Sequence, residues 1–420
     1  MLARVFPPDA GPGHAAPNGA EVNNGVPIPA VVVGGIDNGG GLGLVRSLGR
    51  AGAPVIIVDQ DASAPALHSR YARKHVVPDL TGRSLVRELL TLQATLNVRP
   101  VLFLTSDEAV LTVSQYREEL AAAYRLRLPD HDRLRSLLQK SSFQELAEAR
   151  GFPVPRSVQI TNALEIAGLA QLTFPAVIKP SVKTGDYLMS RFARGYRAAT
   201  IGEAEALCRR ILPVLPNLVV QEWIEGADSD IYFCLQYRGS DRTVSSFTGR
   251  KLSIWPPDIG TTASCTAAPE AHAILAPMTD AFFDAVSFVG MGSMEYKRDA
   301  RTGRFFMIEP TVGRVDWQEE VATLHGVNIP LAAYRYEIGA DLPPEPEAVV
   351  PVIWRDSARH WKAMRRARGG IAAQPKAKVI DAYWRLDDPL PALFHVLSTV
   401  IRILRRTIKR LEPWLPSKAF

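Results

Sequence analysis

The sequence predicts a mixed α/β and α+β protein: a small doubly wound parallel domain, then a larger domain of mostly antiparallel strands, then a basic helical extension. Three patterns indicate this order. From Ala30 to about Leu128, buried apolar strands alternate with helices, as in parallel sheets. After Pro129, strands rich in Val, Ile, Phe and Tyr are joined by turns, which is typical of antiparallel sheets. Finally, Lys and Arg are concentrated beyond Arg355.

Composition excludes several classes of protein. The chain has 420 residues, of which 47% are hydrophobic and 22% are charged, as in ordinary globular proteins. Its three cysteines are far apart and no Cys/His cluster occurs, which argues against a zinc site or a disulfide framework and favours a cytoplasmic location. Residues 1–29 are rich in Pro, Gly, Ala and Asn and lack an apolar core, so we expect a disordered leader rather than a signal peptide.

A glycine cluster follows the first strand, in VVVGGIDNGGGLGLVRSLGRAGAPVIIVDQD over residues 31–61. One interpretation is a dinucleotide site, in which the glycines admit a pyrophosphate to a helix N-terminus and Asp59 binds the ribose. The glycine spacing, however, is longer than the compact G-x-G-x-x-G fingerprint. The other interpretation is a β-α-β unit whose glycines only shape a turn.

The strand expected over residues 98–104 ends in the polar sequence TSDEAV. In doubly wound sheets the strand ends line the crevice that binds ligands, so Asp107 and Glu108 are candidates for such a site. The alternative is a helix N-terminus, where the helix dipole favours acidic residues.

The second domain begins with a predicted helix pair that contains Lys140 and ends at Gly151. Lys179 ends the apolar strand PAVIKP, where its ammonium could reach a phosphate, although a lone lysine of this kind is more often solvated. The segment VVQEWIEG, residues 219–226, ends a buried strand in groups that could face an adenine and a ribose.

The segment GSMEYKRDARTGRFFMIEP predicts two antiparallel strands joined by a hairpin turn, with one carboxylate on each strand. If Glu295 and Glu309 share a face, they form an oxygen-rich site for Mg2+, which takes one or two carboxylates plus phosphate oxygens and water. The alternative is a pair of exposed acids. Against it, Glu309 follows the apolar run FFMI, where an unpaired charge would be costly to bury.

In this order, over about residues 30–339, the motifs resemble the ATP-grasp superfamily, and more narrowly its carboxylate-amine ligase-like members, a group that includes D-aspartate ligases. The resemblance rests on the glycine-rich first β-α-β unit followed by QKSSFQELAEARGFPVP, FPAVIKP, VVQEWIEGAD, GRKLSIWPP, MEYKRD and MIEPTVGR. It implies a Rossmann-like pre-ATP-grasp domain (30–128) and a two-lobed ATP-grasp domain (129–345). The residues beyond, 346–420, are expected to form a basic C-terminal extension with an amphipathic helix.

The resemblance also implies a role for each residue that matches the family pattern. ATP would contact Lys140, Lys179, Lys183 in the lid, Glu222, Trp223 and Ile224 in the adenine hinge, and Asp228 at the ribose. Magnesium would be bound by Glu295, Glu309 and Thr311. The transferred phosphoryl group or the acid would be faced by Arg314, with Arg250 and Lys251 nearby. The acid substrate would also be contacted by Gly39, Gly40, Gly41 and Asp107.

The sequence departs from the family pattern at two places. Thr311 stands where an asparagine usually follows the second magnesium ligand, and a hydroxyl is a poorer match for the amide carbonyl. The lid, SVKTGDY, has fewer glycines than the usual form. These departures concern the second metal position and the phosphate lid.

The function that the resemblance implies is ATP-dependent ligation with ATP and Mg2+ as cofactors. A small-molecule carboxylate would become an acyl phosphate, which an amine, or alternatively a thiol, would then attack. Two other functions stay open. Thr311 is compatible with a nucleotide-binding protein that lacks ligase chemistry, and the glycine cluster is compatible with an NAD-dependent oxidoreductase.

Residues 355–420 contain fifteen Lys or Arg against five Asp or Glu, whereas the whole chain has a net charge of +6. No aromatic stacking platform accompanies these residues, which argues against a nucleic-acid partner. Leu393, Leu397, Val400 and Leu404 recur at helical spacing beside basic residues, in a run too short to span a bilayer. Such a helix either lies on an anionic membrane at its inner face, or packs on the body or on a second subunit of a homodimer.

Overall fold

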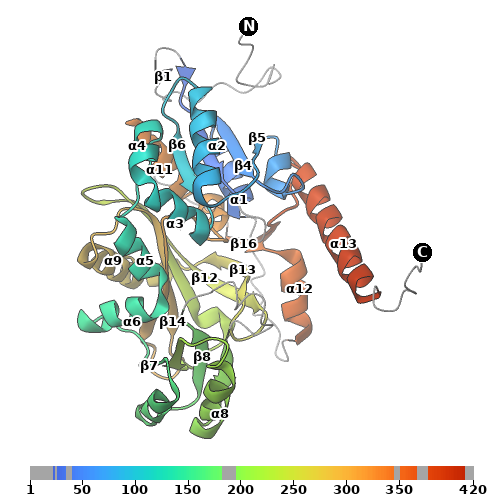
Figure 1. Ribbon diagram of the computed structural model, residues 1–420. Coiled ribbons are helices and arrows are strands. Elements are labelled where there is room, and N and C mark those ends of the chain that lie inside the picture. The colour runs from blue at the N-terminus through green and yellow to red at the C-terminus, as the bar shows by residue number, and fades with distance from the viewer. Residues whose placement is uncertain are drawn as a thin grey trace.

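The structure is a computed structural model and describes residues 22–23, 26–34, 40–181, 195–344, 351–366 and 377–411. Figure 1 shows the N-terminal sheet at one end of the molecule, the large antiparallel sheet in the middle, and a small sheet at the other end. Within the leader predicted over residues 1–29, the described part is a short antiparallel pair, β1 (Val22–Asn23) with β2 (Val26–Pro27), followed by the buried Ile28.

Four parallel strands form the N-terminal sheet in the order β5-β4-β3-β6. Val31 and Val33 enter one hydrophobic core and Ala30 and Val32 enter another, so both faces of the sheet are covered, as a parallel sheet requires. The predicted doubly wound unit is therefore confirmed. Its elements are β3 (Ala30–Val33), α1 (Gly40–Gly49), β4 (Val55–Asp59), η1 (Pro65–His68), β5 (Arg73–Val76), α2 (Gly82–Ala94), β6 (Val101–Leu104), α3 (Asp107–Gln115) and α4 (Arg117–Ala123).

The predicted helix pair joins this domain to the rest of the chain. Helix α5 (His131–Leu138) begins at Asp130, whose carboxylate accepts a hydrogen bond from the backbone N–H of Arg133. Helix α6 (Lys140–Ala149) ends just before Gly151, which has a φ of +73° that favours glycine.

The small sheet holds four antiparallel strands in the order β7-β10-β8-β9. It packs its apolar side chains against η2 and α8 in a core of its own, which makes this lobe a separate packing unit. Its elements are β7 (Ser157–Ile160), η2 (Ala163–Gln171), β8 (Ala176–Pro180), β9 (Tyr196–Ala198), α8 (Ile201–Ile211) and β10 (Leu218–Glu222).

The large sheet has seven strands in the order β15-β14-β11-β12-β13-β16-β17. Its pairs are antiparallel except the last, β16 with β17, which is parallel. Helix α9 contributes to the core on one face, and α10 and α11 contribute to the core on the other. Its elements up to residue 344 are η3 (Asp228–Asp230), β11 (Ile231–Arg238), β12 (Thr243–Trp255), β13 (Thr261–Ala267), α9 (Pro269–Ala285), β14 (Gly290–Arg298), β15 (Phe305–Val312), α10 (Glu320–Leu324) and α11 (Ile329–Ile338).

Residues of the predicted extension take part in both domains. Strands β16 (Val352–Arg355) and β17 (Lys378–Asp381) enlarge the large sheet, with α12 (Ser357–Arg366) between them. Helix α13 (Leu390–Leu411) then packs on η1 of the N-terminal domain. Among the described helices, none has an apolar stretch long enough to cross a membrane.

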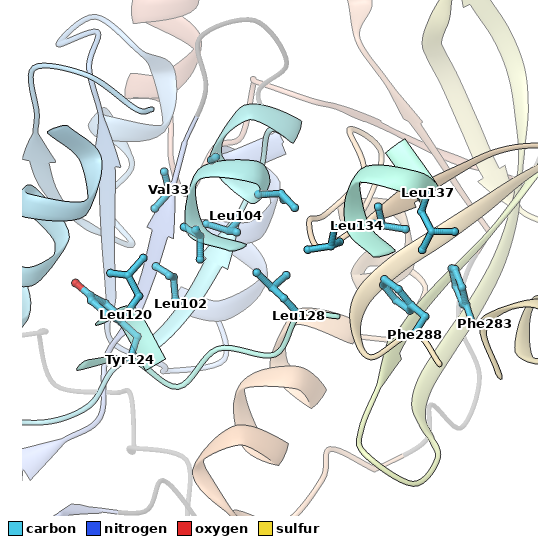
Figure 2. Packing of buried hydrophobic residues seen from close by; sticks show 14 of the residues in the cluster. Val33, Leu102, Leu104, Leu120, Tyr124, Leu128, Leu134, Leu137, Phe283 and Phe288 are labelled. Carbon is cyan, nitrogen blue, oxygen red and sulfur yellow. The ribbon is translucent and has the colours of Figure 1, made fainter. Parts of the chain in front are cut away.

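One hydrophobic core connects the N-terminal sheet to the large sheet. Figure 2 shows Leu102 and Leu104 of β6 on one side, Phe283 and Phe288 beside the large sheet on the other, and Leu128 between them. Because these side chains are buried in a single cluster, the sheets are held in a fixed relation, and residues from both can contribute to one site.

Candidate active site

The two predicted magnesium ligands face each other across neighbouring strands. Glu295 on β14 is the direct partner of Glu309 on β15, and Ser293 is the partner of Thr311. Directly opposed residues of antiparallel strands lie on the same face, and so do residues two apart. The condition on which the magnesium hypothesis depends, a shared face for both carboxylates, is therefore met. Glu309 differs from expectation in being 51% exposed, because the apolar run before it does not enclose its side chain.

Two lysines neutralise these carboxylates. Lys251 on β12 donates to Glu295, and Lys140 at the first position of α6 donates to Glu309 at 2.6 Å. Burial alone would lower the pKa of both ammonium groups, but the neighbouring carboxylates outweigh burial and raise it. Both lysines therefore carry a firmly held positive charge at the carboxylate pair.

Lys179 on β8 completes the set of cations from the side of the small sheet. Its Nζ lies 3.4 Å from the side-chain oxygen of Gln221. Burial lowers the pKa of Lys179, and the nearby charge of Lys140 lowers it further, while Glu309 and Glu295 act in the opposite direction. Lys179 is thus the cation of this site with the least compensation.

Arg314 links the carboxylate pair to the N-terminal domain. Its guanidinium forms an ion pair with Asp107, the first residue of α3, and the backbone N–H of Val315 donates to Leu104 at 3.2 Å. Asp107, Asp316 and Glu309 raise the pKa of Arg314 against the opposing effect of burial. The strand-end acid and the arginine that were predicted separately therefore form one contact between the domains.

Asp316 is a polar residue of this region that the sequence did not single out. Its carboxylate accepts hydrogen bonds from Ser293 at 2.7 Å, Gln318 at 3.2 Å and Thr311 at 3.3 Å. It thereby fixes the hydroxyl that stands in place of the usual asparagine. The available signal was weak, because Asp316 lies only two residues after Arg314 in GRVDWQEE without matching a motif.

Glu319, three residues further on, has an unusual environment. The side chain is 2% exposed, and its Oε1 has no hydrogen-bond partner among the described residues. Burial, with a smaller effect of the Asp316 charge, raises the pKa of Glu319 to about 8. The carboxyl group is therefore largely protonated at neutral pH.

The predicted adenine hinge lies where β10 leaves the small sheet. The Glu222 carboxylate accepts from the backbone N–H of Thr173 at 2.8 Å, and the Trp223 N–H donates to the Pro175 carbonyl at 2.9 Å. Ile224, the next residue, is half-buried. These contacts fix the hinge backbone, and they direct the Glu222 side chain to the start of β8.

Asp228, the predicted ribose ligand, begins η3. Its Oδ2 accepts from the backbone N–H of Ile254 at 3.0 Å, and burial raises its pKa against the opposing effects of this bond and of the Lys297 charge. The described hinge residues and Asp228 thus come from one connection between the small and large sheets.

Some predicted residues do not join this cluster. Arg250 precedes Lys251 on β12 and pairs with Tyr232, so its side chain starts from the opposite face of the strand, and its Nε has no partner among the described residues. Gly40 and Gly41 begin α1, where Gly41 packs near Ile57. Gly39 and Lys183 lie outside the described residues.

Asp59, the acid that a dinucleotide site would need for a ribose, is buried. Its side chain is 1% exposed, and its Oδ1 accepts from the backbone N–H of Asp61 at 3.0 Å. A Cβ on Gly34 would lie 2.6 Å from the same carboxylate. The carboxylate therefore holds a turn inside the domain, which argues against the dehydrogenase alternative.

The donor set fits magnesium better than other metals. Glu295, Glu309 and Thr311 offer oxygen atoms only, which suit a hard cation that keeps waters and substrate phosphate in its shell. Within the described residues, no group of three or more His, Cys, Asp or Glu is arranged to hold a metal. A site completed by a phosphate agrees with both observations.

No protein-family model matches the chain. A curated relative, the D-aspartate ligase of Enterococcus faecium (strain Aus0004), is 22% identical over 335 residues, which cover 76% of this chain and 79% of the relative. The sequence resemblance to this group of ligases thus extends over most of both chains.

Solved structures share the fold at low identity. The N5-carboxyaminoimidazole synthetase of Staphylococcus aureus complexed with ADP is 13% identical with a TM-score of 0.59, and the match covers 78% of this chain and 82% of that one. The biotin carboxylase domain of the Hydrogenobacter thermophilus 2-oxoglutarate carboxylase, a dimer in complex with MgADP and bicarbonate, is 13% identical with a TM-score of 0.58, covering 77% and 73%. At such identities the similarity establishes a common fold.

Proposed function

Because the chain has the ATP-grasp fold, we propose that it is an ATP-dependent ligase that activates a small-molecule carboxylate as an acyl phosphate and joins it to an amine. One observation carries the proposal: the register of β14 and β15 sets Glu295 opposite Glu309, and Lys140 and Lys251 each hold one of them. Phosphoryl transfer requires positioned charges rather than a nucleophilic side chain, and this cluster supplies them.

The nucleotide would lie between the small and the large sheet, because its proposed ligands come from both. Lys179 on β8 and Lys140 on α6 would bind the phosphates. The hinge residues Trp223 and Ile224 would face the adenine, and Asp228 would accept the ribose hydroxyls. Burial and the charge of Lys140 lower the pKa of Lys179, and an anionic phosphate would stabilise its charge, which supports this role.

Magnesium would be held by Glu295 and Glu309, with Thr311 as a weaker third ligand kept in place by Asp316. When bound there, Mg2+ neutralises charge on the phosphate oxygens. Lys251 and Lys140 would remain beside it, and their positive charges would help to balance the negative charge of a triphosphate.

The reaction has two steps. A carboxylate oxygen of the substrate attacks the γ-phosphorus of ATP, the bond from that phosphorus to the bridging oxygen breaks, and ADP leaves. The amine then attacks the acyl carbon, inorganic phosphate leaves, and the amine loses a proton. Arg314 is proposed to stabilise the transferred phosphoryl group, and the Asp107 ion pair positions its guanidinium.

The acid substrate would bind at the carboxyl ends of β3 and β6, near Asp107 and the glycines that begin α1, which is the ligand side of doubly wound sheets. The curated relative described above is a D-aspartate ligase. D-Aspartate is therefore the first amino acid to test, both as the acid that is activated and as the attacking amine. Because the nucleotide is made and used in the cytoplasm, we place the reaction there.

The experiment is a screen of purified protein for phosphate release from ATP, with acids and amines supplied in pairs. We expect release that requires both ATP and a specific acid. In Glu309→Ala it should fall by about a hundredfold or more, since each interaction realised in the transition state contributes several kcal/mol. Glu119→Ala, a surface carboxylate on α4 paired with Arg83, is the matched control and should keep full activity. Full activity of Glu309→Ala would contradict the assignment.

The two alternatives are distinguished by the phosphate-release assay and by a titration with NADH. A nucleotide-binding protein without ligase chemistry would bind ATP but release no phosphate with any acid. An NAD-dependent oxidoreductase would instead change the fluorescence of NADH on titration. Because Asp59 is buried, we expect no such change.

A further inference from the structure

Helix α13 exposes an apolar face that no described residue covers. The exposed fractions are 59% for Leu393, 58% for Val396, 47% for Leu397 and 46% for Val400. Positions separated by three or four residues lie on one side of a helix, so these side chains form a stripe, which Leu390 and Ile401 extend at its two ends. A stripe of this size in water marks a surface that binds something.

The opposite side of the helix start is already occupied. Phe394 stacks on His68 of η1 with ring centroids 3.3 Å apart, and His395 stacks on Tyr383 at 3.6 Å. Ala392 is buried. The helix is therefore anchored on the N-terminal domain by one side, and Figure 1 shows its remaining length leading away from the body.

The charge of the helix selects the kind of partner. Residues 390–411 contain five basic residues and no Asp or Glu; the basic residues are Arg402, Arg405, Arg406, Lys409 and Arg410. An anionic surface neutralises such a helix, and the attraction adds to the burial of the apolar stripe. In the sequence the stripe continues with Leu404, Ile408 and Leu411 at the same spacing.

A second copy of the chain fits this helix less well. In a pair of α13 helices that bury their stripes against each other, all charged residues would be basic, with no acidic residue of either helix to pair with them. Coiled-coil pairs normally flank the seam with charges of both signs. Helix α13 contains no acidic residue, so it cannot supply the negative charges of such a pair.

We propose that α13 docks the protein on anionic lipid bilayers, with its axis in the plane of the interface and the stripe Leu393–Ile401 among the acyl chains. Trp384 and Leu386, which are 56% and 89% exposed, add exposed apolar surface just before the helix in the sequence. This inference is independent of the ligase proposal, because α13 contributes no residue to the candidate active site.

The test uses the full chain and vesicles of phosphatidylcholine, either alone or mixed with phosphatidylglycerol. We expect sedimentation with the anionic vesicles and little with the neutral ones. The triple variant Leu393→Gln, Leu397→Gln, Val400→Gln should lose binding. The triple variant Arg405→Gln, Arg406→Gln, Arg410→Gln should weaken it on the order of a hundredfold, since each basic residue contributes about fivefold. Leu164→Gln, at an exposed leucine on η2, is the matched control.

The outcomes separate the possible occupants. Binding that is equal on neutral vesicles, or that survives the leucine substitutions, overturns the proposal. So does a wild-type dimer in sedimentation velocity that the leucine substitutions convert to a monomer without any vesicle binding, which would assign the stripe to a second copy. Circular dichroism and thermal melting of each variant show whether it is folded, and phosphate release is measured in parallel because it should not change.

Discussion

At the scale of single residues, Lys140 and Lys179 illustrate how position determines charge. Lys140 has Glu309 within 2.6 Å, which outweighs the effect of burial on its pKa, whereas Lys179 has a neutral glutamine and another lysine as neighbours. A buried ammonium with little compensation destabilises the folded state. Lys179 therefore lowers the stability of the folded state, and a ligand-binding role explains why a lysine is present there.

We expect Lys179→Met to lose ATP-dependent activity and to gain stability. Removing a poorly compensated charge should raise Tm by about 2–4 °C, which corresponds to about 1 kcal/mol in a domain of this size. Differential scanning fluorimetry of the protein without ligands measures the shift. Lys140→Met should give no such gain, because it leaves Glu309 without its ammonium partner. A lower Tm for Lys179→Met would show that the lysine is well compensated.

Glu319 predicts a specific dependence of stability on pH. Its ordinary pKa is 4.5, and burial raises the pKa to about 8 in the folded chain. Between these values the folded state keeps a proton that the unfolded state releases, so stability falls as pH rises from about 5 to 8. Glu319→Gln cannot titrate and should lack this fall.

The comparison is made by urea unfolding of both proteins at pH 5 and pH 8. The free energy of unfolding of the wild type should decrease by roughly 3 kcal/mol more than that of Glu319→Gln over this range. Parallel changes in the two proteins would mean that Glu319 is charged in the folded state.

The sequence predicted the carboxylate pair well, because both acids lie in one hairpin and the register follows from local pairing. Arg250 shows the limit of a motif, since strand alternation turns it away from Lys251 whatever the resemblance implies. Asp316 and Glu319 depend on the path of an irregular segment between β15 and α10, and no period or spacing in the sequence describes that path.

At the scale of elements, helix α1 is fitted to its surroundings through glycines. A Cβ on Gly49 would lie 2.5 Å from the Cβ of Tyr71 and 2.9 Å from its carbonyl oxygen. Backbone atoms cannot move aside cheaply, so the helix end requires glycine for close packing. From the sequence, the glycines before the helix could have a ligand-binding role or a turn-shaping role, whereas Gly49 at the helix end serves close packing.

We expect Gly49→Ala to lower the free energy of unfolding by about 1–3 kcal/mol, which is typical of overpacking. The matched control is Gly202→Ala in α8, where an added Cβ meets nothing within 4 Å. That substitution should raise stability by roughly 0.5–1 kcal/mol, because alanine loses less backbone entropy on folding. Urea titration of both variants checks the opposite signs, and a neutral Gly49→Ala would refute the packing argument.

The elements of the N-terminal sheet and the β14–β15 hairpin were predictable because their patterns are local. Strands β16 and β17 were not, since VIWR and KVID are short and are separated by a basic stretch. Strand β16 pairs with β13 through contacts such as Cys265 with Trp354, which are distant in the sequence, and β17 pairs with β16. No local pattern encodes such contacts.

At the scale of the whole molecule, the buried ion pair of Arg46 and Asp388 joins the N-terminal domain to the C-terminal residues. Both side chains are at most 1% exposed and lie 2.9 Å apart. Arg46 also donates to the carbonyls of Ala382 and Tyr383, and Asp388 accepts from Ser69 at 2.8 Å. The C-terminal residues are therefore part of the folded body.

We expect Asp388→Ala to destabilise the protein by about 3–5 kcal/mol, because it leaves the Arg46 charge buried without its partner. The neighbouring Asp387→Ala removes an exposed pair with Arg50 and should cost less than about 1 kcal/mol. Urea denaturation followed by tryptophan fluorescence compares the two. If both substitutions lowered the free energy of unfolding by similar amounts, burial would not determine how much the Arg46 ion pair contributes to stability.

The same ion pair has a consequence for biosynthesis. The acceptors of the Arg46 guanidinium lie 336 to 342 residues further along the chain, so they leave the ribosome long after α1 has been made. Domains generally fold as they emerge, N-terminal first. Here the guanidinium of Arg46 lacks its native acceptors until residues 382–388 have been translated. The nascent N-terminal domain is therefore expected to be less stable than the same domain in the whole chain, and to depend on chaperones until residues 382–388 are available.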